Sequence, residues 1–512
     1  MFVDRRGAVT HAMVGSARSI ELPDWGRLRA GQGRLRGLRC IHTHLGEEAL
    51  THDDLTDLAK LRLDAMVTIG LDAEGLPRDA HVAHLRPAQA DEAVVEQMAP
   101  TPPARLDLDF AEWIRALEEE LSRSTRTREV GTTERAVLVA VSAGRPRSET
   151  EDSLDELREL ARSAGVEVAD VLLQQRAQRD PRTVVGEGRL EDLVLRAFRH
   201  DAELVIFDSD LTPAQARNLG ERLDLRVIDR TQLILDIFAQ RARSRDGKLQ
   251  VELAQLRYRL PRLAQRDDGL SRLAGGIGGR GPGEQRLEVD RRRVRERIAR
   301  LERELGGLRR EREGRRRRRT RRGVPVLSIV GYTNAGKSTL LRALTGAEVP
   351  IGDRMFATLD PTSRRLRLAD PRGPSDGGLG RDVVVTDTVG FIRDLPPDLR
   401  DAFRATLEEL GDADVFLHVV DAAAPDFEER IDAVRGVLEG MGLGDTPELL
   451  VFNQADRLEP GVGAAIASRH GGVAVSALRG IGLEALRERA AARLWHEDPG
   501  EASRRQIARG VA

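Results

Sequence analysis

The sequence predicts an α/β protein of several domains, one of which carries a long helical hairpin. Apolar strands alternate with helical patterns between residues 136 and 242, and two leucine heptad segments then flank a short run of glycines. The length of 512 residues also exceeds one ordinary core, since about 150 residues per domain suggest three or four units. We expect an extra N-terminal α/β domain at 1–100, a linker helix at 101–130, a second α/β domain at 131–245, the hairpin at 246–322, a third α/β domain at 323–495 and a C-terminal tail at 496–512.

Composition bears on three properties of the protein: its affinity for nucleic acid, its disulfides and its relation to membranes. The 82 basic residues nearly balance the 84 acidic ones, so any affinity for nucleic acid must come from local clusters of arginine. Cys40 is the single cysteine, which rules out an intramolecular disulfide and fits a reducing compartment. The N-terminus has no apolar signal segment, and no stretch approaches 18 uncharged apolar residues. We therefore expect a cytoplasmic monomer without a membrane segment.

The first hundred residues mix short apolar runs with six of the ten histidines and end in the breaker-rich MAPTPPA. The amphipathic stretch 106–123 follows as a connecting helix. Strands are then expected at 136–141, 166–173, 203–208 and 225–229, each followed by a helix, at 153–165, 188–198, 212–224 and 230–242. This alternation indicates a mainly parallel sheet.

Two heptad seams predict the arms of the hairpin. The first has Leu249, Leu253, Leu256, Leu260 and Leu263, and the second has Val294, Ile298, Leu301, Leu305 and Leu308. Since a short glycine connection joins them, the arms are expected to fold back as an antiparallel pair. Pro261 should kink or shorten the first arm. The second, about 27 residues at ~1.5 Å each, would reach about 40 Å.

The connection contains Gly276-Ile277-Gly278-Gly279-Arg280-Gly281, which fits the G-x-G-x-x-G pattern of a dinucleotide-binding turn. That turn requires a strand before it, whereas this one follows a heptad helix, so we reject a dinucleotide site. We expect instead a cationic tip with few side chains, able to enter a narrow space lined by RNA.

Arginine is concentrated after this tip. Residues 287–322 hold 17 arginines and 7 acidic residues, which is the pattern of a phosphate-binding surface or of a solvated linker. Because the run adjoins an extended hairpin instead of a disordered tail, we favour contact with nucleic acid.

The strongest pattern begins at residue 325. The apolar stretch 325–330 is a buried strand, a complete G-x-x-x-x-G-K-S loop follows, and 339–346 is the helix that such a loop opens. Backbone N–H groups surround the phosphates, Lys337 reaches the β and γ phosphates, and the Ser338 hydroxyl coordinates Mg²⁺. The expected nucleotide contacts are Gly331, Tyr332, Thr333, Asn334, Ala335, Gly336, Lys337, Ser338 and Thr339.

Residues that would sense a γ-phosphate follow in order. Thr358 can bring a second hydroxyl to Mg²⁺, and Asp387 follows an apolar strand, where a Walker B aspartate acts on Mg²⁺ through water. Gly390 supplies a backbone N–H for the γ-phosphate. We expect catalytic roles for Asn334, Lys337, Thr358 and Gly390, and further nucleotide contacts from Phe356, Ala357, Leu359, Asp360, Thr388 and Val389.

The base is read by Asn453-Gln454-Ala455-Asp456, after the strand 448–452. The Asp456 carboxylate can accept from the ring N–H and the exocyclic amine of guanine, and adenine offers neither donor there. Ser476, Ala477 and Leu478, expected on the next strand, support the base oxygen. The nucleotide is therefore GTP.

These motifs resemble the GTPase domains of the translation-factor superclass, and GYTNAGKSTL, FATLDPT and DTVGFI resemble the HflX family of ribosome-associated GTPases. The resemblance extends over about 130–322, through DPRTVVGEGRLEDL and the glycine loop. It implies a P-loop GTPase domain preceded by an α/β domain with an antiparallel hairpin. It also implies binding of the large ribosomal subunit and its RNA, splitting or rescue of stalled ribosomes, and faster GTP hydrolysis on the ribosome.

Three positions bear on activity. Gln454 stands where the family has lysine, so guanine specificity is expected with weaker binding. Phe391 follows DTVG where many GTPases have a water-orienting glutamine, so another group must position the water or intrinsic turnover is slow. By resemblance to GTPases with an asparagine in this loop, Asn334 is a candidate K⁺ ligand that would supply charge in the transition state.

The N-terminal extension carries a separate pattern. His42, His44, Thr51 and Asp54 resemble the H-x-H-P…S-x-x-D zinc motif of JAB/MPN metalloproteases and RadC-like proteins. Leucine replaces proline, threonine replaces serine, the spacing is one residue short, and no partner glutamate is evident, with His11 in the region where one would be sought. A zinc site, a JAB-like fold without metal, and ordinary surface or core histidines all stay open.

Three functions compete at this point. The leading one is a ribosome-binding GTPase whose nucleotide state sets how the hairpin sits on ribosomal RNA. The others are a metallohydrolase with a regulatory GTPase domain, and an RNA-binding assembly module in which GTP turnover is incidental.

Overall fold

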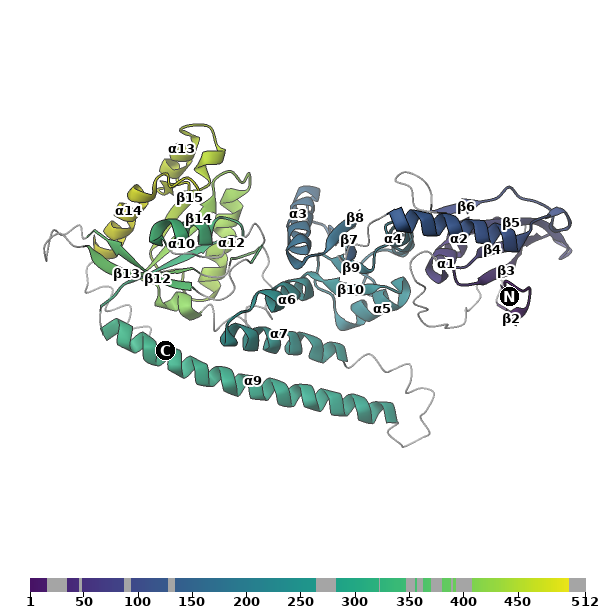
Figure 1. The fold of residues 1–512 in the computed structure, drawn as a ribbon, viewed down its shortest axis with the longest axis horizontal. Coiled ribbons are helices and arrows are strands. Elements are labelled where there is room, and N and C mark those ends of the chain that lie inside the picture. Colours follow the sequence, from purple (N-terminus) through teal and green to yellow (C-terminus); the bar gives the residue numbers. More distant parts are fainter. Residues whose placement is uncertain are drawn as a thin grey trace. The chain divides into compact units, whose positions relative to one another are not determined.

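The computed structural model describes residues 1–15, 35–45, 48–86, 94–127, 134–263, 282–321, 323–346, 355–356, 362–369, 380–387, 390–392 and 408–496. The chain divides into two compact units, Met1–Arg230 and Thr231–Ala512. Figure 1 shows the helices and strands of both units.

The N-terminal domain is a six-stranded sheet with two long helices (Figure 1). The strand order is β2-β1-β3-β4-β5-β6, and β3 pairs parallel with β4 while the other pairs are antiparallel. The elements are β1 (Phe2–Asp4), β2 (Val9–His11), β3 (Leu38–Leu45), α1 (His52–Leu61), β4 (Ala65–Leu71), β5 (Pro77–Leu85), β6 (Val95–Gln97), the 3₁₀ turn η1 (Pro103–Arg105) and α2 (Phe110–Thr127).

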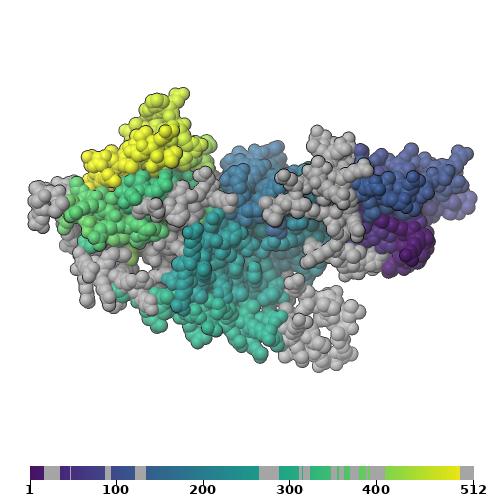
Figure 2. Space-filling view, in the orientation of Figure 1, coloured from purple at the N-terminus to yellow at the C-terminus, as the bar shows by residue number. Residues whose placement is uncertain are grey.

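Helix α2 is part of this domain's core. Ile114, Leu117 and Leu121 on its apolar face are buried in one cluster with Phe2 of β1 and Leu58 of α1. In the space-filling view the first strands, in purple, and the later segments, in blue, form one continuous surface (Figure 2). The segment expected as a linker thus provides one side of the core, because its apolar residues recur at helical spacing and need a partner face.

The second domain of this unit has four parallel strands in the order β10-β9-β7-β8, which confirms the expected parallel sheet. Buried Arg230 holds its carboxyl end together through ion pairs to Glu156 (2.7 Å) and Asp208 (3.1 Å). Its elements are β7 (Arg135–Val141), α3 (Arg147–Ala164), β8 (Glu167–Gln174), α4 (Glu187–Arg199), β9 (Leu204–Phe207), α5 (Pro213–Leu223) and β10 (Arg226–Asp229). Helix α6 (Arg230–Arg241) follows β10 directly and belongs to the second unit from Thr231 on.

Helix α1 of the N-terminal domain packs against α4 of the second domain. His52 Nε2 lies 3.5 Å from a carboxylate oxygen of Glu191, and Arg62 stacks over the ring of Phe198. Helix α1 therefore contacts α4 near both of its ends, through His52 at the start and Arg62 just after the last turn.

The helical pair consists of α7 (Arg245–Leu263) and α9 (Pro282–Arg321), which lie side by side and run in opposite directions (Figure 1). Ion pairs Arg297–Glu252 (2.7 Å) and Arg257–Glu302 (2.6 Å) join them. The seam predicted on α9 is its less exposed face, with Leu301 fully buried. In α7 the described helix ends two residues after Pro261.

Helix α9 corrects the expected length of the second arm. It has 40 residues, which at ~1.5 Å each gives about 60 Å, because the helix continues through the arginine run to Arg321. Arginine has a high helix propensity, so a run of it does not end a helix. The glycine tip at 276–281 lies outside the described residues. Among the helices of the described ranges, none is long and apolar enough to span a membrane.

The C-terminal α/β domain has a six-stranded sheet in the order β12-β13-β11-β14-β15-β16, with only β12 antiparallel to its neighbour. Its elements are β11 (Val326–Gly331), α10 (Lys337–Thr345), β12 (Thr362–Leu368), β13 (Arg381–Asp387), the 3₁₀ turn η2 (Glu408–Asp412), β14 (Val415–Asp421), α12 (Phe427–Gly440), β15 (Glu448–Asn453), the 3₁₀ turn η3 (Ala455–Arg457), α13 (Val462–Arg469), β16 (Val473–Ala474) and α14 (Leu483–His496). Strand β11 is central, so the loop after it lies at the carboxyl edge of the sheet, where ligands bind in such folds.

Candidate functional site

The loop between β11 and α10 requires its glycines. Gly331 has φ 146° and a Cβ there would lie 2.2 Å from the carbonyl oxygen of Val419. Gly336 has φ 87°, and a Cβ there would lie 2.3 Å from Nδ2 of Asn453. The loop therefore takes a tight turn against two neighbouring strands, as a phosphate-binding loop must.

Lys337 is a buried cation at the start of α10. Its side chain is 7% exposed, and Nζ donates to the carbonyl oxygen of Tyr332 at 2.7 Å. Burial lowers the pKa of Lys337 to about 8, against the opposing effect of the Asp387 charge. A Cβ at Gly390 would lie 2.8 Å from Nζ, so the backbone after β13 passes directly beside the lysine. An anion bound here would meet this ammonium group.

Ser338 and Asp387 form the second part of the site. Ser338 Oγ donates to Asp387 Oδ2 at 2.7 Å, and the Asp387 carboxylate is fully buried at the end of β13. A hydroxyl and a carboxylate are the hard oxygen ligands that suit Mg²⁺, so these residues fit the ion that the sequence predicts. Thr358, the third expected ligand, lies outside the described residues.

Asn453 joins the phosphate loop to the base-reading loops. Its side chain is 3% exposed, Nδ2 donates to the carbonyl oxygen of Ala335 at 2.9 Å, and Oδ1 accepts from the N–H of Ala477 at 2.9 Å. One amide thus holds three segments that are distant in the sequence.

Comparisons with known proteins agree with this geometry. Residues 151–239 match a family described as "GTP-binding GTPase N-terminal", 241–319 match "GTP-binding GTPase Middle Region", and 326–454 match "50S ribosome-binding GTPase". The GTPase HflX of Caldanaerobacter subterraneus is 47% identical over 385 residues, which cover 75% of this chain and 84% of that protein. The GTPase HflX of Escherichia coli is 48% identical over 326 residues, which cover 64% of this chain and 74% of that protein.

The chain belongs to the HflX family of GTPases. Its P-loop GTPase domain is the one that carries the site above, and the fold class predicted from the sequence is confirmed. The three matched regions begin at residue 151, so the N-terminal domain lies outside all of them.

Gln454, at the position where the resemblance leads us to expect lysine, contacts the phosphate loop. It adopts φ 61°, its Nε2 donates to the carbonyl oxygen of Asn334 at 3.1 Å, and Arg457 donates to its Oε1 at 2.7 Å. Asp456, the carboxylate expected to bind guanine, is exposed.

The residues expected to support the base oxygen lie in a loop. Strand β16 is only Val473–Ala474, so Ser476, Ala477 and Leu478 follow the strand instead of lying on it. Ser476 is buried and its Oγ accepts from the N–H of Arg479 at 3.1 Å, whereas Leu478 is 71% exposed. The backbone N–H groups of Ser476 and Ala477 are already used, by the carbonyl oxygen of Ile481 at 3.0 Å and by Oδ1 of Asn453 at 2.9 Å.

Two phenylalanines border the segments expected to sense the γ-phosphate, 357–360 and 387–390, which we call the switch segments. Phe391 is buried, and its backbone exchanges hydrogen bonds with Gly331 (3.1 Å) and Thr333 (2.8 Å). Phe356 has φ 55° and its ring packs edge-on against Phe238 of α6, at 4.6 Å between ring centroids. Sequence patterns did not indicate this contact. Ala357, Leu359, Asp360, Thr388 and Val389 lie outside the described residues.

The structure also brings together the histidines singled out in the N-terminal domain. His42, His44 and Asp54 offer ligand atoms that all lie within 4.8 Å of one another. His11 is exposed on the edge strand β2 and is not part of this group.

Proposed function

We propose that this HflX-family GTPase binds the large ribosomal subunit in the cytoplasm as a monomer, and couples GTP binding and hydrolysis to ribosome splitting, rescue or assembly. The observation that supports the proposal is the short connection along the chain between the long helix α9 and the phosphate loop. Helix α9 ends at Arg321 and β11 begins at Val326, and β11 leads directly into the phosphate loop. Only β11 and residues 322–325 therefore lie between the phosphate loop and α9 along the chain, so a change at the γ-phosphate has a short path to the long helix.

The charge of α9 supports RNA as the surface that it meets. Helix α9 exposes Arg292, Arg293 and Arg300. These arginines form surface ion pairs with acidic residues of the same helix, such as Arg300–Glu304 at 3.1 Å. Exposed pairs of this kind contribute at most about 1 kcal/mol, so phosphate groups can replace the acidic partners. Each arginine that neutralises a phosphate releases a counterion, which makes the interaction sensitive to salt.

For the nucleotide we propose that Lys337 contacts the β and γ phosphates and that the N–H of Gly390 contacts the γ-phosphate. Ser338 and Thr358 would hold Mg²⁺ directly and Asp387 through water; the bound ion would neutralise charge on the phosphates. Asp456 selects guanine, with Asn453, Gln454 and Ser476 shaping the pocket. Because the Phe391 side chain cannot polarise water, the rate of hydrolysis depends on groups other than a glutamine.

We propose that a potassium ion held by Asn334 supplies part of the positive charge that stabilises the transition state of GTP hydrolysis. Asn334 is exposed in the loop with φ 62°, a backbone that places its carbonyl against Gln454. We expect GTP hydrolysis to be about tenfold faster in K⁺ than in Na⁺ buffer, and Asn334→Ala to remove this difference. Single-turnover rates of the full chain give the comparison, with Asn218→Ala on α5 as the control. Equal rates in the two salts would contradict K⁺ binding.

Ribosome binding is tested by co-sedimentation with purified large subunits. We expect the full chain to pellet with them at least about tenfold more in a non-hydrolysable GTP analogue than in GDP, because the switch segments are set by the γ-phosphate. A variant with Ser in place of the glycines at 276, 278, 279 and 281 tests the tip, and should keep GTP binding while losing ribosome splitting. Equal pelleting in both nucleotides would overturn the proposed coupling.

For the N-terminal domain, the resemblance to JAB/MPN and RadC-like proteins stays a prediction. A metallohydrolase regulated by the GTPase domain would need a metal centre in this domain.

A further inference from the structure

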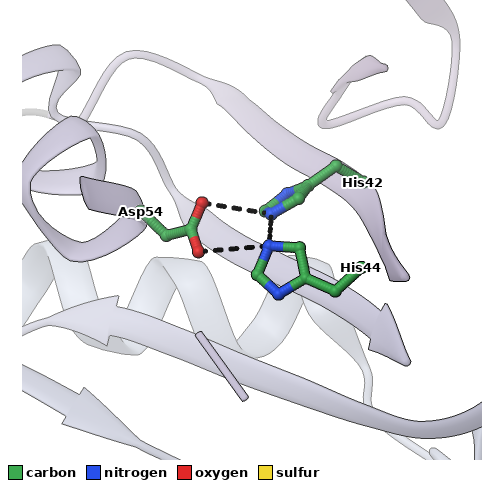
Figure 3. A group of neighbouring side chains, drawn as sticks. All are labelled: His42, His44 and Asp54. Carbon is green, nitrogen blue, oxygen red and sulfur yellow. Dashed lines mark hydrogen bonds and ion pairs between the residues drawn. The ribbon is translucent and has the colours of Figure 1, made fainter. Parts of the chain in front are cut away.

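Two imidazoles and a carboxylate converge in the N-terminal domain (Figure 3). His42 and His44 lie two residues apart on β3, so their side chains share one face of the sheet. Asp54 is in the first turn of α1, and all three side chains point toward a common centre (Figure 3). Their exposed fractions are 8%, 16% and 16%, so the group is sheltered and still reachable from solvent.

The separations between the nearest ligand atoms are close to the edges of a tetrahedral coordination shell, with the two nitrogens nearest to different oxygens of the carboxylate. His42 Nε2 lies 3.0 Å from His44 Nε2, and these nitrogens lie 3.1 and 3.4 Å from Asp54 Oδ1 and Oδ2. Zinc bonds to nitrogen and oxygen of about 2.0–2.2 Å at tetrahedral angles put neighbouring ligand atoms about 3.3 Å apart. A single ion would therefore need only small side-chain adjustments.

Hydrogen bonds among His42, His44 and Asp54 cannot satisfy all three groups at once. A neutral imidazole carries at most one hydrogen on Nε2, and the carboxylate only accepts. If both nitrogens donate to Asp54, two N–H groups face each other across 3.0 Å; if one nitrogen donates to the other, the second has no hydrogen for the carboxylate. Three lone pairs directed at one cation avoid this conflict.

The carboxylate is held in place before any ion arrives. Thr51 is the N-cap of α1, and both its backbone N–H and its hydroxyl donate to Asp54 Oδ2 at 2.7 Å. On the other side, Cys40 Sγ lies 4.0 Å from His42 Nδ1, so Nε2 is the nitrogen that faces the aspartate. Such supporting contacts orient metal ligands and strengthen binding.

We propose that His42, His44 and Asp54 bind one divalent ion of the zinc class, through the two Nε2 atoms and a carboxylate oxygen. Imidazole nitrogens favour zinc and its transition-metal neighbours over Mg²⁺ or Ca²⁺. Three protein ligands leave a fourth position for water or for an oxygen of a bound molecule, which distinguishes this centre from a closed structural site. The proposal is independent of the GTPase function.

The test measures zinc in the full chain. After saturation with zinc and removal of free metal, we expect about one zinc per chain, and cobalt substitution should give the visible absorption of tetrahedral Co²⁺. His44→Ala and the isosteric Asp54→Asn should each weaken zinc binding by at least about a hundredfold in a chelator competition. His52→Ala is the matched control, since this histidine is 52% exposed and faces Glu191.

GTP hydrolysis by each variant reports that the GTPase domain is intact, and the thermal unfolding curve of the full chain, compared with that of the parent, reports that the N-terminal domain is still folded. Zinc below about a tenth of an equivalent in the parent chain, or zinc binding unchanged by both ligand substitutions, would show that the cluster is only a hydrogen-bonded group. Loss of zinc on His52→Ala with His44→Ala unaffected would also refute the assignment.

Discussion

Replacing Lys337 with methionine is expected to lower kcat/KM for GTP hydrolysis about a thousandfold while leaving the melting temperature at or above that of the parent chain. Methionine fills a similar volume but cannot contact phosphate, and the loss of one preorganised cationic donor costs 10²–10³ in rate in comparable sites, as an order of magnitude. The stability of the nucleotide-free chain should not fall, because burial of the Lys337 ammonium group is unfavourable, as its lowered pKa shows, and methionine removes that cost.

The pH dependence of stability provides a second readout of the same substitution. The pKa of Lys337 is about 8 in the folded chain and about 10.4 when unfolded, so between these values the unfolded chain binds more protons. The free energy of unfolding of the nucleotide-free chain should therefore rise with pH over this window, by up to about 3 kcal/mol relative to Lys337→Met.

Urea unfolding at pH 7.5 and 10 measures this difference. Lys248→Met is the matched control, because Lys248 is exposed on α7 and should change neither the GTPase rate nor the pH slope. A Lys337→Met chain that is unstable at pH 7.5 would show that the lost activity comes from unfolding instead of lost phosphate contact.

Much of the fold could be predicted because local patterns determine it. The strands at 136–141 and 203–208 lie within a residue of β7 (Arg135–Val141) and β9 (Leu204–Phe207), since continuous apolar runs and amphipathic helices have distinct periods. Of the helices between them, α4 is within a residue of its expected bounds, whereas α3 begins at Arg147, six residues before the expected start. The loop from Gly331 to Ser338 was recognised because its glycines, lysine and serine serve the phosphate directly, whatever surrounds them.

What the sequence did not reveal depends on contacts between distant segments. Nothing local shows that Ile114 of α2 joins a core with Phe2, or that Phe356 packs on Phe238. The His42, His44 and Asp54 group was noticed from spacing, yet only the fold shows that β3 and the start of α1 bring three ligand atoms to one point. Asn453 was expected to serve the base, and its bond to Ala335 became visible only with the sheet assembled.

The second large effect is expected for Asn453→Ala, which should disconnect the phosphate loop from the base-reading loops. The carbonyl of Ala335 loses its bond from Nδ2, and the N–H of Ala477 loses its acceptor, both in buried positions. At about 1–3 kcal/mol for each lost partner, we expect unfolding to become easier by about 3 kcal/mol and GDP affinity to fall about a hundredfold.

Equilibrium binding of a fluorescent GDP analogue and urea unfolding measure the two effects separately. Asn218→Ala on α5 is the control, because Asn218 Nδ2 donates to the carbonyl of Arg182 at an exposed position, 3.3 Å away, and its loss should change neither quantity appreciably. The link is specific if GDP affinity in Asn453→Ala falls under conditions where the chain is still fully folded. If affinity stays within about threefold of the parent chain, Asn453 contributes to stability alone and the phosphate loop keeps its shape without it.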